Sequence, residues 1–417
     1  MPVARVVLAA ATLLLAGLTG CSAGSPGRPG SPAPPAAPRP TASTARAPLA
    51  LPTAPTAWSQ ASGDAARSSA TAAIGPQQAT VRWQRRLEGA VTPGAAVGTD
   101  GSVLLASDGG VLHALDPATG SDRWTVGGGG RYGSDLSTTP AVLGDGTILW
   151  PAPGNRLLAV DQHGKMLWSQ AFSGFVLSPA VVGGDRVYVG DQAGRLSALD
   201  VRPGGAHSTA WTLELGGTSY GSPAVGADGT VYTTTGRQLV AVTDRGTSGT
   251  VRWRFSARDT VEVSPAVAAD GTVVLGTNGD DEIGVGPDGR ERWRFPKGDF
   301  SYSSPVVRAG KAYFGDHLGY LDVLDAATGR QLRRDLGIPK AQGTTGDGTG
   351  VWTAPLVDAA GDVYSGTAAG HVYGTGPDGR RLFDLDAGSV VASYPALTAD
   401  GTLVIGSQGG TVYALRG

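Results

Sequence analysis

The sequence predicts an all-β protein: an eight-bladed β-propeller of four-stranded antiparallel blades, with the ring closed by an N-terminal strand. One proline recurs at the same place in each repeat, at spacings of 39 to 50 residues, which is the period of propeller blades. Each interval contains short apolar runs separated by Gly and Asp, without the 3.6-residue periodicity of a helix. The eight repeats are marked by Pro93, Pro140, Pro179, Pro223, Pro265, Pro305, Pro355 and Pro395.

The stretch from Leu177 to Asp200 shows what one repeat contains. It has three apolar runs separated by turns rich in Gly and Asp, and Trp211 heads a fourth run after an insertion. Such a unit is too small to be stable alone, because each face of a four-stranded sheet needs something to pack against. The neighbouring repeats are expected to supply that partner.

Most repeats end with a Gly, three further residues and an aromatic residue. A small residue and an Asp precede this pattern, as in the stretch 114–124. The small residue lets sheets approach, Asp and Gly make the turn, and the aromatic ring is expected to cover the gap to the next blade. The predicted blade-docking residues are Trp83, Trp124, Trp168, Trp211, Trp253, Trp293 and Phe383, whereas the sixth repeat has Arg333 at this place.

The two ends of the repeat region complement each other. Residues 80–85, which include Trp83, look like the final strand of a blade whose other strands are missing, and the last repeat supplies three strands before the chain stops. If the first strand completes the last blade, the ring has no open edge. We therefore predict a lead-in at 58–79 and the propeller at 80–417.

The first 57 residues are predicted to lie outside the folded domain. Residues 1–20 carry one positive charge and an apolar run that is short for a bilayer but suits a secretory signal. The residues before Cys21 resemble a bacterial lipobox, which predicts lipidation of Cys21; the alternative is a plain signal peptide with an incidental Cys. The 36 residues from 22 to 57 include ten prolines, so residues 21–57 are expected to form a disordered tether.

Composition narrows the class of partner without identifying one. The 33 basic and 35 acidic residues nearly cancel, and no basic tract typical of nucleic-acid binding is present. Because Cys21 is the only cysteine, no disulfide can form within the chain. The 66 glycines sit mostly at repeated turn positions, where positive φ is useful. These features indicate an exported soluble domain that does not bind nucleic acid.

The repeat at 114–124, Ala-x-Asp-x-x-Thr-Gly-x-x-x-Trp, resembles the tryptophan-docking repeat of quinoprotein β-propellers, the pyrroloquinoline-quinone-type repeat family. The lead-in at 58–68 is also similar to the segment that often opens members of this family. The resemblance implies the propeller fold but not one activity. The family includes quinone-dependent dehydrogenases and the lipoprotein of the outer-membrane protein-assembly complex, and the non-catalytic branch fits this chain better.

Catalytic members of that family imply adjacent cysteines, a catalytic Asp, calcium ligands from Glu, Asn and Asp, and long insertions. The adjacent cysteines are absent here. The acidic run 279–282 is the best calcium candidate, but it lacks alternating ligand spacing and is interpreted as a solvated loop. The run 127–130 of four glycines lacks the ending of a phosphate loop. The histidines show no metal-binding pair, so no metal, cofactor or catalytic residue is predicted; they are His113, His163, His207, His317 and His371.

The expected binding face carries the segments that arrive at each marker proline and the loops between the second and third strands. Polar and aromatic residues in these loops suit a protein, peptide or glycan partner, although the tyrosines at 220, 302 and 394 could instead plug the channel. The candidates are Arg131, Tyr132, Asp135, Asp191, Gln192, Tyr220, Asn278, Asp299, Tyr302, Asp316, His317, Lys340, Trp352, Tyr394 and Gln408.

Two function classes follow from these patterns. In the first, the protein is a monomeric lipoprotein anchored through Cys21 on the outer face of the cytoplasmic membrane, and its propeller is a non-catalytic binding or scaffolding module. In the second, it is a quinone-dependent oxidoreductase of the quinoprotein family. The missing cysteines and the short repeats favour the first class.

Overall fold

The computed structural model describes residues 59–417, apart from 70, 133–137, 177–180, 184–185, 203–204, 337–349 and 352. The predicted signal peptide, Cys21, the tether and Trp58 lie outside these residues, as do Asp135, Lys340 and Trp352. No helix among the residues it describes is long and apolar enough to cross a membrane.

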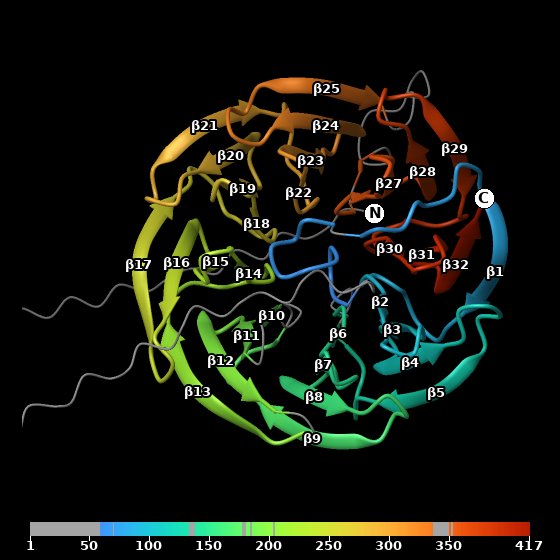
Figure 1. The fold of residues 1–417 in the computed structure, drawn as a ribbon, viewed down its shortest axis with the longest axis horizontal. Coiled ribbons are helices and arrows are strands. Elements are labelled where there is room, and N and C mark those ends of the chain that lie inside the picture. Colours follow the sequence, from blue (N-terminus) through green and yellow to red (C-terminus); the bar gives the residue numbers. More distant parts are fainter. Residues whose placement is uncertain are drawn as a thin grey trace, which may run out of the picture. The chain divides into compact units, whose positions relative to one another are not determined.

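The described strands form eight four-stranded antiparallel sheets arranged around a central axis (Figure 1). This arrangement confirms the predicted eight-bladed propeller. In blades 1 to 7 the four strands follow one another in sequence from the axis outward. In six blades the marker proline lies directly before the innermost strand, whereas Pro179 stands two residues and Pro93 three residues before the first residue of that strand. A residue without an N–H is tolerated at such a strand start.

Blades 1 to 4 consist of β2 (Ala96–Val97), β3 (Val103–Ser107), β4 (Val111–Leu115) and β5 (Asp122–Gly127); β6 (Ala141–Val142), β7 (Ile148–Ala152), β8 (Arg156–Val160) and β9 (Met166–Ala171); β10 (Val181–Gly183), β11 (Arg186–Asp191), β12 (Arg195–Val201) and β13 (His207–Glu214); and β14 (Ala224–Val225), β15 (Val231–Thr235), β16 (Gln238–Asp244) and β17 (Gly249–Ser256). Blades 5 to 7 consist of β18 (Ala266–Val267), β19 (Val273–Gly276), β20 (Asp281–Val285) and β21 (Glu291–Pro296); β22 (Val306–Arg308), β23 (Lys311–Gly315), β24 (Tyr320–Asp325) and β25 (Gln331–Leu336); and β26 (Leu356–Val357), β27 (Val363–Gly366), β28 (His371–Thr375) and β29 (Arg381–Asp386).

Blade 8 joins the two ends of the propeller. Its sheet has the order β1-β32-β31-β30, formed by β30 (Ala396–Leu397), β31 (Leu403–Gly406), β32 (Thr411–Arg416) and β1 (Thr80–Arg86). In the register of β1 against β32, Trp83 lies opposite Ala414. The predicted closure by the N-terminal strand is therefore confirmed, and its reason is the unpaired edge that β32 would otherwise expose.

Burial follows the position of each strand in its blade. All residues of β3, β7 and β15 are buried, because second strands lie between neighbouring sheets and both of their faces are covered. The outermost strands alternate instead, as β17 does along its whole length, because one face packs inward and the other meets solvent. The core is thus a ring of interfaces between blades.

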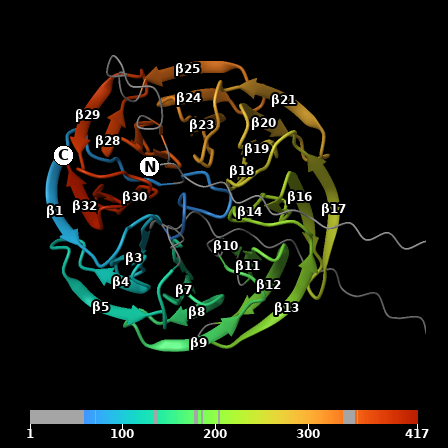
Figure 2. The ribbon, with the colours of Figure 1, turned by 180° about the vertical axis from the view of Figure 1, so that it is seen from behind.

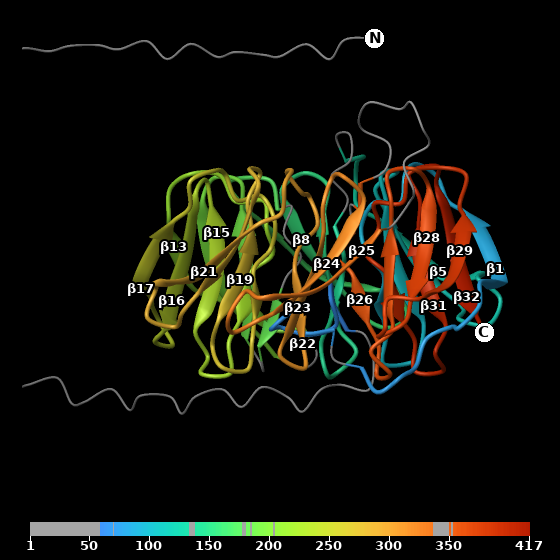
Figure 3. The ribbon, with the colours of Figure 1, turned by 90° about the horizontal axis from the view of Figure 1, so that it is seen from above.

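The lead-in crosses the centre of the ring (Figures 1 and 2, blue). Its backbone carbonyls accept hydrogen bonds from the last residues of innermost strands: Val142 N–H donates to Ser59 at 2.8 Å, and Val225 N–H donates to Ala65 at 2.8 Å. Residues 59–79 are here called the channel segment. This segment pairs through backbone hydrogen bonds with the innermost strands of four blades, near the axis. These partners lie where innermost strands lead into their first turns, so the segment lies at one face of the disc (Figure 3).

The propeller has two faces, which carry different loops. The crossover face carries the connections between blades and the turns between second and third strands. The segment face carries the turns between first and second strands, the turns between third and fourth strands, and the channel segment. This division follows from the alternating strand directions within each antiparallel blade.

Candidate binding surface

Four predicted docking tryptophans donate a hydrogen bond from the indole Nε1 to a backbone carbonyl of the following blade. Trp83 donates from Nε1 to the carbonyl of Pro117 at 3.0 Å, and Trp293 donates to the carbonyl of Ala326 at 3.0 Å. Trp124 and Trp253 donate in the same way to Gln162 and Pro287, at 2.7 and 2.9 Å. These bonds join consecutive blades through the turn between the third and fourth strands.

The same rings lie on glycines of those turns. A Cβ added to Gly120 would stand 2.6 Å from the Trp83 ring, and one added to Gly329 would stand 2.5 Å from the Trp293 ring. Both glycines also have φ near +70°, a conformation that favours glycine. The Gly and the Trp of the repeat pattern are therefore two halves of one contact between blades.

The remaining docking positions vary this contact. Trp211 donates from Nε1 to the Asp244 carboxylate at 2.9 Å, and Trp168 stacks on His207 with ring centres 3.9 Å apart. Phe383 is buried and stacks on Tyr364 in its own blade. All seven aromatic residues belong to the interfaces between blades, so they position the two faces rather than form a ligand site.

The central channel is occupied by two side chains. Arg67 of the channel segment is 1% exposed and donates from Nη2 to the Ser62 hydroxyl at 3.0 Å. Its guanidinium carbon lies 6.0 Å from the ring centre of Tyr394, whose hydroxyl is 3.3 Å from that of Ser304 in blade 6. Burial lowers the pKa of Arg67. Tyr394 therefore bridges blades across the axis, which favours the channel-plug interpretation for this tyrosine.

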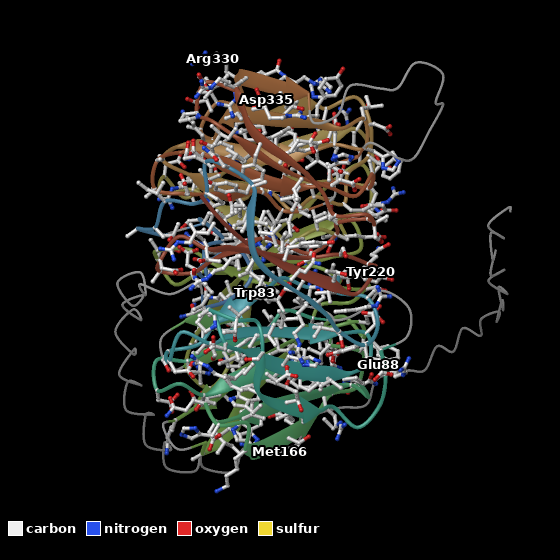
Figure 4. All side chains as sticks on the ribbon, turned by 90° about the vertical axis from the view of Figure 1, so that its right-hand side faces the viewer. Trp83, Glu88, Met166, Tyr220, Arg330 and Asp335 are labelled. Atoms are coloured by element: carbon white, nitrogen blue, oxygen red, sulfur yellow. The ribbon has the colours of Figure 1, made fainter. Side chains whose placement is uncertain are left out.

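The crossover face carries exposed aromatic side chains. Phe175, Tyr220 and Tyr302 are 52%, 43% and 48% exposed, and all three precede a marker proline. They are the aromatic residues among the large exposed hydrophobic ones in the described part of the chain. Tyr220 and Glu88, which both lie in connections between blades, are seen at the same edge of the disc in Figure 4.

One of these aromatic residues belongs to a cluster. Phe300 stacks on His317 with ring centres 4.1 Å apart and meets Tyr302 edge-on at 5.5 Å. His317 and Tyr302 were predicted from the sequence for the binding face, whereas Phe300 and Phe175 were not. Their position in the repeat could have identified both phenylalanines, because they stand four or five residues before a marker proline.

Other sequence-predicted residues have structural roles on this face. Arg131 is exposed and pairs with Glu88. The Tyr132 ring lies edge-on to Trp150, its hydroxyl donates to the carbonyl of Pro151, and burial raises its pKa. The side chains that are half-buried are those of Gln192, Asn278, Asp299 and Gln408.

Two carboxylates predicted for the binding face are buried. Asp191 accepts a hydrogen bond from the Arg195 N–H at 3.2 Å, and Asp316 accepts one from the Tyr320 N–H at 2.8 Å. Asp316 also pairs with Arg334 at 2.8 Å. Each Asp caps the turn between the second and third strands, since its short side chain bonds nearby backbone. Their placement as partner-facing groups was wrong.

The acidic run 279–282 also differs from the solvated loop that was expected. Asp281 and Glu282 begin β20, and Glu282 is fully buried between blades. Its Oε2 lies 3.7 Å from Nζ of Lys297, which donates to the carbonyl of Thr277 at 2.9 Å. Burial raises the pKa of Glu282 to about 7 and lowers that of Lys297. The run was misread because the sequence of one strand does not show that Glu282 is paired with Lys297 in the folded protein.

A family model described as the outer membrane protein assembly factor BamB matches residues 67–204 and 205–417. The chain belongs to this family. A segment of 151 residues is also 33% identical to the serine/threonine-protein kinase AfsK of Streptomyces griseus, covering 34% of this chain and 18% of the kinase. The chain thus corresponds to less than a fifth of the length of that relative.

Solved structures show the same fold at low sequence identity. BamB from Moraxella catarrhalis aligns with a TM-score of 0.61 and 17% identity over 81% of this chain and 100% of that one. Quinohemoprotein alcohol dehydrogenase from Comamonas testosteroni aligns with a TM-score of 0.67 and 15% identity, over 87% and 80%. The computationally designed Ika8 protein gives 0.63 and 15%, over 82% and 99%. The propeller fold of this chain is therefore found both in BamB and in a quinoprotein dehydrogenase.

The described carboxylates of this BamB-family chain are not grouped as the ligands of a calcium ion would be. Within the described ranges, no group of three or more His, Cys, Asp or Glu side chains is placed to share a metal ion. The carboxylates nearest to such a role are engaged by cations, as Glu282 is by Lys297 and Asp281 is by Arg294. Two residues of the predicted candidate at 279–282 are thus paired with cations of β21 and of the residue that follows it.

Proposed function

We propose that the protein is an exported, lipid-anchored BamB-family propeller that acts as a non-catalytic binding module and holds a protein or glycan partner on its crossover face. The observation that carries this proposal is the distribution of exposed aromatic residues. Phe175, Tyr220 and Tyr302 all lie in connections between blades. Exposed aromatic rings bury large areas at low entropic cost and so are typical of binding surfaces.

The channel segment supports the choice of face. It pairs with four innermost strands at the segment face, and Arg67 and Tyr394 close the axis behind it. A partner at the crossover face therefore lies on the side of the propeller opposite to the channel segment. The family match supports a role in binding other proteins, because the family model that matches this chain is described as an assembly factor.

The test is capture of partners by the full-length protein on cells. Photo-crosslinkers placed beside position 220 should capture a defined partner, and a combined Tyr220→Ala, Tyr302→Ala change should reduce capture at least tenfold, about 1.4 kcal/mol in binding free energy. The matched control is Ile74→Ala, Met166→Ala, which removes exposed apolar side chains from the channel segment and from the rim (Figure 4). Equal capture by the folded double variant and the control contradicts the proposal.

The proposed anchor is tested separately. Acyl chains on Cys21 would bury CH₂ groups at about 0.8 kcal/mol each, so the wild type should partition into detergent and Cys21→Ser should be released. Mass spectrometry of the mature N-terminus identifies cleavage before residue 21. Release of both forms into the medium in equal amounts would show that the leader acts as a plain signal peptide.

The second candidate function is a quinone-dependent oxidoreductase, favoured by the fold shared with quinohemoprotein alcohol dehydrogenase. It ranks behind the binding module because the chain has one cysteine, at position 21, and because Asp281 and Glu282 of its candidate acidic run are paired with Arg294 and Lys297.

A further inference from the structure

The junction between blades 6 and 7 is built differently from its neighbours. In blades 3, 4 and 7, a tyrosine of the second strand packs against the docking ring of the fourth strand, with ring centres 5.8 to 6.1 Å apart. Blade 6 keeps the tyrosine as Tyr313 but has Arg333 in place of the ring. The wide, flat group that fills the other junctions is therefore missing at this one.

Arg333 still contacts the next blade, but its narrow side chain does not fill the space that an aromatic ring occupies at the other junctions. Its guanidinium donates to the carbonyls of Gly376 and Pro377 in the next blade, and its Nε pairs with Asp335 at 2.7 Å. Asp335 lies on the outermost strand of blade 6 (Figure 4). Beside this thin side chain a hollow of about 250 Å³ opens on the segment face. Its lining includes Arg308, Lys311, Tyr313, Val323, Val357 and Pro377.

Blade 6 also reverses the charge of its first turn. In five blades this turn is Asp-Gly-Ser or Asp-Gly-Thr, as in 100–102 and 270–272, whereas in blade 6 it runs from Arg308 to Lys311. Arg308 donates to the backbone carbonyls of Ser69 and Thr71, which are neutral. Among the described residues, no carboxylate lies within ion-pair distance of Arg308 or Lys311. Neither cation therefore forms an ion pair with a described residue at the hollow.

The carboxylates at this junction accept hydrogen bonds from neutral groups of the protein. Asp358, which lines the hollow, is fully buried and accepts hydrogen bonds from the Gly75 and Asp362 N–H groups and from the Tyr364 hydroxyl. Asp362 accepts from the Gln77 amide and Asp378 caps its own turn. The Tyr313 phenol lies near Arg308 and Arg333, and while its burial raises its pKa, the two guanidiniums act in the opposite direction.

We propose that this hollow binds a small ligand that joins an anionic group, a carboxylate or a phosphate, to a flat carbon ring. Arg308 and Lys311 hold the anion, while Arg333 stays bonded to Asp335 and to the next blade. The ring occupies the space that an indole fills at other junctions, against Tyr313 and Val357. The site lies on the segment face, so it is distinct from the crossover surface proposed for the partner and does not depend on it.

The size and chemistry of the hollow set the class of ligand. Its volume of about 250 Å³ is below the ~300 Å³ at which pockets for drug-sized molecules begin, so the ligand has few atoms beyond one ring. Arg forms paired hydrogen bonds to carboxylate and phosphate, whereas Lys acts as a point charge. A neutral ring of the same shape gains only the apolar contact.

The test is a calorimetric titration of the full-length protein with three ring probes at constant ionic strength: benzoate, phenyl phosphate and neutral benzamide. We expect at least one anion to bind saturably below about 1 mM, and benzamide to bind at least ~10-fold more weakly. Tighter binding of phenyl phosphate identifies a phosphate ester as the natural class, and tighter binding of benzoate identifies a carboxylate. Equal binding of all three probes, or of none, overturns the proposal.

Variants locate the binding. Arg333→Trp restores the indole of the other junctions, so it should abolish anion binding while leaving the melting temperature equal or higher. Lys311→Gln removes an exposed cation and should weaken the better anion about tenfold, which keeps the test decisive if the Trp variant does not fold. The matched control is Lys165→Gln, an exposed cation in a turn of blade 2. Undiminished binding by folded Arg333→Trp, or equal effects of the two Lys variants, places the anion elsewhere.

Discussion

Trp293 and Gly329 show how one side chain and one bare backbone position make a joint of the ring. The indole donates to Ala326 of the next blade, and the Gly at φ +70° leaves room for the ring. Either residue alone is common in loops. Together they convert a short turn into a contact between sheets, so the stability of the ring depends on both.

Trp293→Ala should destabilise the protein by about 3–5 kcal/mol, because a buried indole is lost and a cavity remains between blades 5 and 6. The measurement is urea unfolding followed by fluorescence or circular dichroism. Leu332→Ala, at an exposed position of β25, is the control and should change stability by no more than about 0.5 kcal/mol. A change below about 1 kcal/mol for Trp293→Ala would mean that the blades hold together without this joint.

Glu282 is a second residue whose environment sets its behaviour. Burial raises its pKa to about 7, so between its unfolded value near 4.3 and pH 7 the folded protein holds a proton that the unfolded chain releases. Stability should therefore fall as the pH rises through this window. Burial also raises the pKa of Asp322 to about 6, which adds a slope of the same sign.

Glu282→Gln removes one of these protons and should flatten the fall in unfolding free energy between pH 5 and pH 7.5. The check is urea unfolding of both proteins at several pH values across that range. Glu214→Gln, at an exposed position of β13, serves as the control and should keep the wild-type slope. Parallel curves for wild type and Glu282→Gln would show that this carboxyl stays ionised in the folded state.

Strand β1 contributes to the fold in two ways. It supplies the fourth strand of blade 8 and brings Trp83 to blade 1, so it closes both a sheet and the ring. Without it, β32 would present an unpaired edge, which favours association with other chains. The channel segment acts differently, because it adds single backbone bonds to several innermost strands.

Chains that begin at residues 57, 80 and 93 separate these two contributions. The chain from 57 should melt highest, the chain from 80 should lose only the channel segment, and the chain from 93 should also lose β1 and aggregate. Light scattering and thermal melts are the measurements. If the chains from 80 and 93 melt equally high and equally cooperatively, closure through β1 contributes nothing to stability.

The repeated first turn is another element with a consistent design. In the turns at 228–230, 270–272 and 400–402 the Asp accepts bonds from the backbone or hydroxyl of the Thr two residues on, and an Arg of the outermost strand reaches it. Burial opposes ionisation of Asp400, but these bonds prevail and hold its pKa at about 2. The turn is a local device that ties the first and fourth strands of a blade.

For the molecule as a whole, the propeller presents two dissimilar faces. The crossover face is rich in exposed aromatic residues, and the segment face carries the N-terminal pairing and the cationic hollow. A disc with separate faces can hold a partner on one side while a small ligand binds on the other. Function then depends on the loops rather than on the fold, which unrelated activities share.

Pyrroloquinoline quinone and Ca²⁺ together should leave the melting temperature of the full-length protein unchanged and should not produce dye-linked alcohol oxidation. The reason is that a ligand bound only by the native state would stabilise it by RT ln(1 + [L]/Kd), and three candidate carboxylates, Asp281, Glu282 and Asp316, are already paired with cations. Ca²⁺ alone is the control. A saturable rise in melting temperature that requires the quinone would favour the oxidoreductase.

The sequence alone determined the architecture of this protein. The recurring prolines, the Gly and Trp of each repeat and the strand around Trp83 predicted eight blades and their closure, because these features arise from turn chemistry and from contacts repeated at a fixed period. The same pattern also showed that Arg333 departs from the repeat. Each inference needed only neighbours along the chain or one repeat away.

Only the tertiary structure decided which side chains reach solvent. Asp316 and Glu282 are buried although their sequence context is polar, Tyr394 crosses the channel, and Tyr302 remains exposed. The hollow beside Arg333 likewise needs Arg308 from the same blade and Val357 from the next. Burial at these positions depends on segments tens to hundreds of residues away, such as Arg67 beneath Tyr394, and local sequence patterns carry no record of those distant partners.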